Sequence, residues 1–236
     1  MSFIFRNCKR FLVKLSPAFY ASRNKLYVDF TNKHLESTAN QKSLKMLDVG
    51  GSDGSLASLS YESLASIGFN VFVVVLDLSS KALRDGKTVH SVLNYICGDV
   101  THLPFNPNAF DIVCSYSVFE HLDKPKDAAK EMARVSKGLC VVQIPNMRFF
   151  IEPHTKTPFL FLFPSLVRTK IVQITGIPYF LNFNVTPANL IRWFKQAKFD
   201  LTDNLDIYHT AWTRLFRTPQ GYLYAFSHIN MGRGIH

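Results

Sequence analysis

The chain has only four cysteines among its 236 residues, and no two of them form a CxxC pair. Three of the four lie in apolar stretches, where a thiol behaves as a small hydrophobic side chain. This pattern argues against a structural zinc site and indicates a reducing compartment. We therefore expect a cytoplasmic protein.

Long hydrophobic runs are also absent. Lys14 interrupts the first candidate, and Arg168 and Lys170 interrupt the second, so no run reaches the roughly 18 residues that a membrane-spanning helix needs. The composition, 47% apolar and 19% charged, is that of a globular protein. The length predicts one α/β domain covering residues 1–236.

Acidic residues are scarce, since 17 aspartates and glutamates face 27 lysines and arginines and leave a net charge of +10. Such an excess suits an anionic partner, which could be nucleic acid, a phosphate-bearing metabolite or an acidic membrane surface. The sign of the net charge alone does not distinguish these three kinds of partner.

Residues 1–30 form a basic segment in which Asp29 is the first acidic residue. Apolar side chains recur there at helical spacing and basic ones take the other side, which indicates an amphipathic helix. Its two sides consist of Ile4, Cys8, Phe11 and Leu15, and of Arg6, Arg10 and Lys14. The helix could pack on the domain, lie on an anionic membrane or serve as an organelle transit peptide.

From Lys45 onward, strand and helix patterns alternate as in a parallel sheet with crossover helices. The apolar runs are continuous, which is typical of strands covered on both faces. We expect strands at 45–49, 71–77, 94–97, 110–115 and 139–144, with helices at about 54–67, 79–87 and 124–136.

An insertion rich in phenylalanine, proline and isoleucine breaks this rhythm at 147–185. A last unit follows, in which Thr186 caps a helix that Pro187 opens and that runs to about Ala197. Strands at 199–207 and 221–229 then close the sheet as a hairpin-like pair around a loop that contains Trp212.

The stretch LDVGGSDGSLA, residues 47–57, is a strand that turns sharply into a helix. Such a turn leaves backbone NH groups free, and small residues let a ligand approach the main chain. At the carboxyl end of a parallel strand this predicts a nucleotide-type site. The nicotinamide pattern G-x-G-x-x-G is not present, because Ser52 and Ser55 stand where it needs glycine.

The spacing of Asp48, Gly50, Ser52 and Gly54 resembles motif I of the class I S-adenosylmethionine-dependent methyltransferases. Serine at the middle glycine is a departure, and Gly51 beside it is expected to supply the lost backbone freedom.

Four further segments match that family in order. Asp77 closes the second strand, where the resemblance implies hydrogen bonds to the ribose hydroxyls. GDVTHLPF at 98–105 resembles the adenine-contacting segment, and FDIVCSYSVFEHL at 110–122 resembles the fourth strand with its loop, in which Glu120 and His121 face the methyl end of the cofactor. IPN at 144–146 fits the end of strand five.

The resemblance covers about residues 44–146, with the later helix and strands in register. It implies an α/β fold with a Rossmann-like, seven-stranded, mostly parallel sheet, helices on both faces and an antiparallel final strand. The implied cofactor is S-adenosylmethionine. The implied cofactor-binding residues are Asp48, Gly50, Gly51, Ser52, Gly54, Asp77, Leu78, Asp99, Val100 and Ser115.

Structural roles remain open for the same acidic residues. Asp48 could bond backbone amides of the turn, and Asp77 could cap the helix that starts near Ser79. For Asp77 and Asp99 we favour cofactor contact, because both fall at the same edge of the sheet. Asp111, at the start of a strand, is expected to be structural.

Two histidines are candidates for catalysis. His121 follows strand four at the cofactor edge, and its ordinary pKa near neutrality suits a base, although it could instead bond the loop or the cofactor. His154, in EPHTKTPF, is the second candidate. We expect no metal, because Glu152 and His154 have no third ligand at useful spacing.

The acceptor is indicated only by exclusion and by the insertion. Ser115, Tyr116, Ser117 and Val118 replace the Asn/Asp-Pro-Pro-aromatic pattern of enzymes that methylate nucleobase amino groups. PFLFLFP at 158–164, KIVQI at 170–174 and IPYFLNF at 177–183 offer apolar surface for a hydrophobic acceptor or a bilayer, or else form a lid packed over the sheet. Basic residues border this surface, namely Arg148, Lys156, Arg168 and Lys170.

These features predict a methyltransferase that acts on an oxygen or carbon of a hydrophobic or lipid-linked small molecule, with an anionic membrane surface as a possible partner. An RNA methyltransferase, favoured by the charge, is less expected. A cofactor-binding protein without activity, in which the insertion serves a partner protein, is a further alternative.

Overall fold

The computed structural model describes residues 25–26, 28–34, 43–149, 152, 154–155, 157–176, 181–207 and 219–228. Residues 1–24, which hold most of the predicted amphipathic helix, lie outside this part of the chain, and so do Lys156 and the loop with Trp212. Residues 28–34 are helical.

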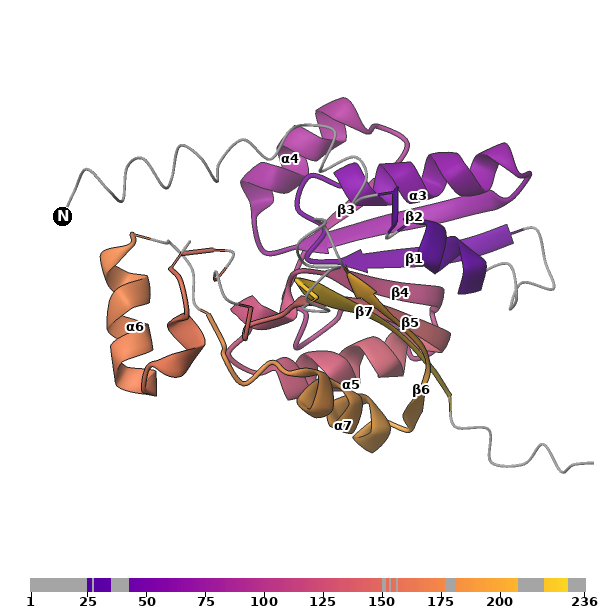
Figure 1. Ribbon diagram of the computed structural model, residues 1–236. Coiled ribbons are helices and arrows are strands. Elements are labelled where there is room, and N and C mark those ends of the chain that lie inside the picture. The colour runs from indigo at the N-terminus through magenta and orange to yellow at the C-terminus, as the bar shows by residue number, and fades with distance from the viewer. Residues whose placement is uncertain are drawn as a thin grey trace, which may run out of the picture.

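Seven strands form one sheet in the order β3-β2-β1-β4-β5-β7-β6 (Figure 1). Strand β7 is antiparallel to both of its neighbours, β5 and β6, and the other pairs are parallel. The predicted fold class and the hairpin-like closing pair are therefore confirmed. The bounds are β1 Ser43–Val49, β2 Asn70–Asp77, β3 Asn94–Cys97, β4 Phe110–Tyr116, β5 Ser136–Pro145, β6 Phe199–Ile207 and β7 Gly221–His228.

Helices cover both faces of the sheet, and each face has its own core (Figure 1). One core joins Leu47 and Val49 of β1 to α5 (Pro125–Val135) and α7 (Pro187–Gln196). The other joins Leu44 and Met46 of the same strand to α3 (Ser55–Ser66) and α4 (Ser80–Val89). This alternation along β1 explains why the strand reads as a continuous apolar run.

The predicted start of α7 is confirmed in detail. The Thr186 hydroxyl accepts a hydrogen bond from the Asn189 amide, and Pro187 occupies the first turn. One cysteine differs from expectation, since Cys97 is exposed whereas Cys114 and Cys140 are buried.

The insertion contains two elements that the sequence did not predict, the short 3-10 helix η2 (Leu160–Leu162) and α6 (Ser165–Ile174). Figure 1 shows α6 beyond the carboxyl ends of the parallel strands, apart from the two helix layers. Leu160, Val172 and Leu181 form a small cluster of their own there. Within the described part of the chain, no helix combines the length and apolarity that crossing a membrane requires.

Candidate functional site

The corner after β1 is built around glycines that cannot carry a side chain. Gly50 has a φ of 73°, and a Cβ there would lie 2.4 Å from Cγ2 of Val118, in the loop after β4. Gly54, the residue before α3, has a φ of 80°, and its Cβ would meet the Tyr95 hydroxyl at 2.8 Å. The loop thus lies directly against the ends of β3 and β4.

Ser52 itself adopts the left-handed conformation, with a φ of 54°. Gly51 does not, so the expectation that Gly51 supplies the lost backbone freedom is wrong. Gly51 is needed for space instead, because a Cβ there would lie 2.6 Å from Oδ2 of Asp48. Serine is tolerated at position 52 although a left-handed residue of this kind carries some strain.

The expected free NH groups at this corner are largely used within the protein. The amides of Gly50 and Gly51 both donate to the Leu76 carbonyl, at 2.7 and 3.3 Å, and that of Gly54 donates to the Gly51 carbonyl at 2.8 Å. The Ser52 amide donates to Oδ2 of Asp77 at 3.0 Å. Side chains, rather than a row of unpaired amides, are therefore the groups that this corner offers a ligand.

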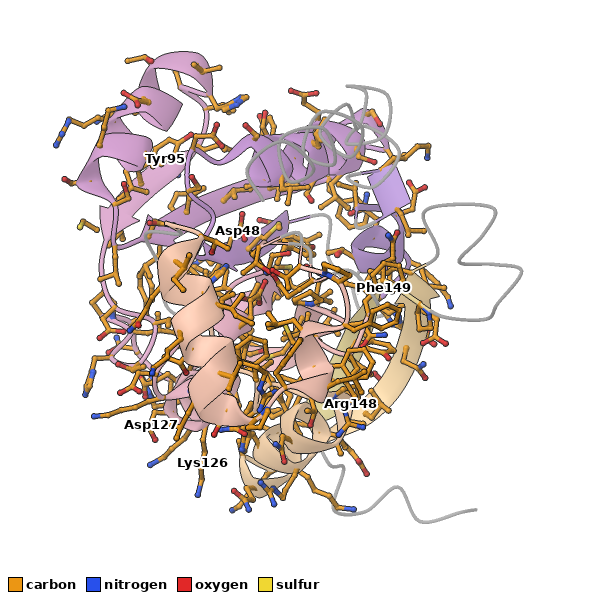
Figure 2. The ribbon with its side chains drawn as sticks, turned by 60° about the vertical axis from the view of Figure 1, so that its left-hand side comes forward. Asp48, Tyr95, Lys126, Asp127, Arg148 and Phe149 are labelled. Atoms are coloured by element: carbon orange, nitrogen blue, oxygen red, sulfur yellow. The ribbon has the colours of Figure 1, made fainter. Side chains whose placement is uncertain are left out.

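Asp48 is 1% exposed, and neither of its carboxylate oxygens has a hydrogen-bond partner among the described residues. Bonds from this side chain to the turn amides, the structural alternative, are thus not observed. Burial, with the nearby Asp77 as a smaller cause, raises the pKa of Asp48 to about 7. Figure 2 labels Asp48 at the carboxyl edge of the sheet, with Tyr95 toward α4.

Asp77 links two loops through one carboxylate. Its Oδ1 accepts a hydrogen bond from the Ser79 amide at 2.7 Å, while Oδ2 accepts the one from Ser52. The Ser79 side chain, not Asp77, caps α4 by accepting from the Ala82 amide. Asp77 is half-buried, and each carboxylate oxygen has a further lone pair for a ligand.

The remaining residues expected to bind the cofactor differ in exposure. Leu78 is 70% exposed, and the Asp99 side chain is half exposed while its Oδ1 accepts from the Thr101 amide at 2.8 Å. Val100 is buried. Ser115 is fully buried, and its hydroxyl has no hydrogen-bond partner within the described ranges. Contact of these residues with a cofactor stays a prediction.

Supporting residues that the sequence did not single out lie beneath the loop. The Tyr95 hydroxyl donates to the Asp53 carbonyl at 3.1 Å, and a Cβ at Gly86 of α4 would lie 2.2 Å from that same oxygen.

Asp111 is structural as expected, since it accepts from the Lys45 amide at 2.8 Å and pairs with Lys137 at 2.7 Å.

Both candidate catalytic histidines lie together, at the end of β4 next to the glycine corner. The 3-10 helix η1 (Phe119–His121) carries Glu120 and His121, and the insertion brings His154 beside them. The two imidazole rings meet edge to face with centroids 5.1 Å apart. Sequence spacing did not predict this cluster, because its members come from segments more than 30 residues apart.

Two carboxylates flank the histidines. Glu120 is fully buried, and burial raises its pKa to about 7. Glu152 is 1% exposed and accepts from Nδ1 of His154 at 2.6 Å. Glu152 also accepts from the amides of His154 and Thr155. Glu152 and His154, for which the sequence indicated no third metal ligand, thus lie close to η1.

Asn182, from the far end of the insertion, joins η1 to that segment. Its amide donates to the Glu120 carbonyl at 2.7 Å, and its side-chain Nδ2 donates to the Leu122 carbonyl at 3.0 Å. Both ends of the insertion therefore converge on the turn after β4.

Residues 47–142 match the family described as Methyltransferase domain. A demethylmenaquinone methyltransferase from Renibacterium salmoninarum is 38% identical over 93 residues, which are 39% of this chain and 37% of that protein. Another, from Staphylococcus epidermidis, is 28% identical over 207 residues, with 85% of this chain and 78% of that protein covered. The chain thus spans little more than a third of the length of the Renibacterium salmoninarum protein.

Among solved structures, magnesium protoporphyrin IX methyltransferase from Synechocystis with bound SAH has a TM-score of 0.60 and 14% identity over 88% of this chain and 84% of that one. The order and directions of the strands and the match over residues 47–142 make this chain similar to class I methyltransferase domains. S-adenosylmethionine is the cofactor of this class. Both of the relatives described above carry the name demethylmenaquinone methyltransferase.

The corner fits that cofactor. Asp48 is a buried carboxylate whose oxygens lack hydrogen-bond partners among the described residues, and only a residue without a Cβ fits beside it at position 51. Leu78 and the half-exposed Asp99 supply an apolar and a polar group at the neighbouring strand ends. Sugar, base and a cationic group each have a matching side chain along this edge.

Proposed function

We propose that the protein transfers a methyl group from S-adenosylmethionine to an oxygen or carbon of a hydrophobic or lipid-linked small molecule. The observation that carries the proposal is the corner where Asp48 and Asp77 flank a loop that requires glycine at 50 and 51, inside the matched methyltransferase domain.

Four side chains would hold the cofactor. Asp77 would accept hydrogen bonds from the ribose hydroxyls, and its charge would disfavour a ribose phosphate. Asp99 would accept from the adenine amino group, and the exposed Leu78 would cover the apolar base. Asp48 would face the cationic end of the cofactor, whose positive charge favours the ionised form of this carboxyl. When bound, the cofactor supplies an electrophilic methyl group on a sulfonium.

The acceptor would lie against the histidine cluster. Val118 contacts the glycine corner, and His121 follows three residues later, so the cluster stands next to the cofactor loop. We propose His121 and His154 as the catalytic residues, which would contact the reacting oxygen or its neighbour and help to hold it in line with the methyl group.

A hydrophobic acceptor is supported by the surface of the insertion. Its large apolar side chains include six that are 39–84% exposed: Phe159, Leu162, Phe163, Leu166, Val167 and Ile174. A lid packed over the sheet would bury them instead, whereas these six project from a segment with its own small cluster. The quinone methyltransferase names of two relatives favour the same class of acceptor.

The same surface supports a place at the membrane for a cytoplasmic protein. Lys170 lies on α6 among these apolar residues, and basic side chains beside an apolar patch bind anionic lipid surfaces. The predicted helix near the amino terminus would add a second weak anchor. Peripheral attachment would bring the enzyme to a lipid-linked acceptor.

The decisive experiment offers methyl-labelled cofactor to the protein together with lipid, RNA or soluble extract in separate reactions. We expect label in an organic-phase product from the lipid extract. Label in RNA alone would replace this proposal by RNA methylation, and cofactor binding without any labelled product would favour a binding protein. Asp77→Asn serves as the matched negative control.

A further inference from the structure

We propose that Glu120, His121 and His154 form a binding site for one divalent transition-metal ion of the Zn²⁺ type. This departs from our sequence-based expectation that the protein has no metal site. Two imidazoles and one carboxylate are a ligand set that zinc accepts, with a further coordination position left open. Metal binding at this site does not depend on the proposed methyl transfer.

The ligand atoms already converge. Oε1 of Glu120 lies 3.9 Å from Nε2 of His121 and 4.0 Å from Nε2 of His154, and one ligand atom from each residue lies within 4.8 Å of the others. Ligands of a tetrahedral zinc ion are about 3.4 Å apart. Small rotations of the three side chains would therefore close the site around a cation.

The buried carboxylate points to a missing positive charge. Glu120 is 0% exposed, and neither oxygen has a hydrogen-bond partner among the residues that the structure describes. A buried carboxylate in this situation is costly unless a cation or a set of donors compensates it. Nε2 of His121 and Nε2 of His154 lie at 3.9 and 4.0 Å from Oε1, where they could share a cation with it.

Glu152 orients one of these imidazoles. Its Oε1 lies 2.6 Å from Nδ1 of His154, which favours the tautomer with the proton on Nδ1 and assigns Nε2, 4.0 Å from Oε1 of Glu120, as the metal ligand. Two electron-pair donors then face each other across 4.0 Å, which is too long for a hydrogen bond and suits an intervening metal ion. A carboxylate behind a metal-binding histidine commonly plays this part.

The site remains accessible on one side. The His121 side chain is 27% exposed and that of His154 is 15% exposed, whereas Glu120 is closed off. Three protein ligands leave room for an oxygen ligand from solvent. If the proposed function holds, an oxygen of the acceptor could take that position, so we expect oxygenated acceptors to bind more tightly to the metal-loaded protein.

The test uses the full chain without a polyhistidine tag, freed of metal with a chelator. Calorimetric titration with Zn²⁺, and visible absorption after addition of Co²⁺, measure stoichiometry and ligand geometry. The wild-type protein should bind one equivalent with a tetrahedral Co²⁺ spectrum. Glu120→Gln and His154→Ala should each abolish that spectrum, and Glu152→Gln should weaken binding about 10- to 100-fold.

His102→Ala is the matched control, because its side chain is 85% exposed and is not one of the three ligands, so binding should remain unchanged. Circular dichroism identifies any variant that does not fold. If a ligand variant fails to fold, the Zn²⁺ affinity of Glu152→Gln decides the test. The proposal is overturned if folded wild-type protein binds no stoichiometric Zn²⁺, or if Glu120→Gln and Glu152→Gln bind it like the wild type. Cofactor titration of the same samples keeps this result separate from failure of the methyltransferase proposal.

Discussion

Gly50 lies so close to Val118 that a Cβ at position 50 would approach Cγ2 of the valine to 2.4 Å. The loop after β1 therefore contacts the loop after β4, and no side chain fits between them. This contact joins the proposed cofactor corner to the segment that carries Glu120 and His121, which makes its disruption informative.

Replacing Gly50 by alanine should lower the free energy of unfolding by about 2–4 kcal/mol, because it combines a left-handed backbone with overpacking. Val118→Ala added to Gly50→Ala should restore at least about 1 kcal/mol by relieving the clash. Gly176→Ala is the control for backbone strain alone, since Gly176 has a φ of 70° with nothing near its missing Cβ. Urea unfolding is measured for the wild type, Gly50→Ala, Val118→Ala, the double variant and Gly176→Ala, and an absence of coupling between positions 50 and 118 would contradict the contact.

Asp77→Asn should weaken cofactor binding about 10- to 100-fold in calorimetry, because charged hydrogen bonds to the ribose would be lost. The matched control is Asp111→Asn. Asp111 also accepts from a backbone amide, but at the start of β4, so its loss should affect stability and leave cofactor affinity unchanged. Equal affinity for wild type and Asp77→Asn would refute the assigned role of Asp77.

Asp48 should make the protein less stable as pH rises. Its pKa is raised to about 7 in the folded state, whereas an unfolded aspartate titrates near about 3.9. Between these values the folded state binds more protons than the unfolded state, so the free energy of unfolding falls from about pH 4 to pH 7 and levels off above. The full change is on the order of 4 kcal/mol.

Asp48→Asn should remove this slope in urea unfolding at a series of pH values. Because Glu120 also has a raised pKa, the comparison is made in a Glu120→Gln background, which leaves Asp48 as the carboxyl under test. Parallel stability profiles with and without Asp48 would show that its carboxyl titrates normally.

Leu166→Glu and Ile174→Glu should each reduce binding to anionic vesicles about tenfold, because their side chains are 78% and 84% exposed on α6 and would enter the lipid surface. Flotation measures the bound fraction. Val89→Glu is the control, since Val89 is 73% exposed on α4, outside the insertion. If Val89→Glu weakened binding as much as the α6 variants, the assignment to this surface would be wrong.

The strands and most helices could be predicted because each produces a local pattern. The runs around Leu47 and Val75 are buried on both faces of the sheet, and Thr186 and Pro187 mark a helix start by their chemistry. Helix α6 was missed for a local reason as well. Apolar and basic residues alternate around it without one clear stripe, and only Val172 is buried.

The histidine cluster could not be predicted, because it depends on contacts between distant segments. His121 was recognised from the loop after β4 and His154 from the insertion, but nothing in the spacing of EPHTKTPF indicates that Glu120 lies beside them. The carboxylates along the sheet edge, Asp48, Asp77 and Asp99, were easier to predict, since the ends of parallel strands meet at one edge by topology.

The two bonds from Asn182 to the turn after β4 have an evolutionary consequence. In the proposed function, the insertion would line the acceptor site and supply His154, and its Asn182 holds the turn that carries Glu120 and His121. We therefore expect acceptor selectivity and activity to be inherited together. Grafting residues 147–185 onto a related domain should transfer acceptor selectivity and activity together when Asn182 is kept. The same graft with Asn182 replaced should not.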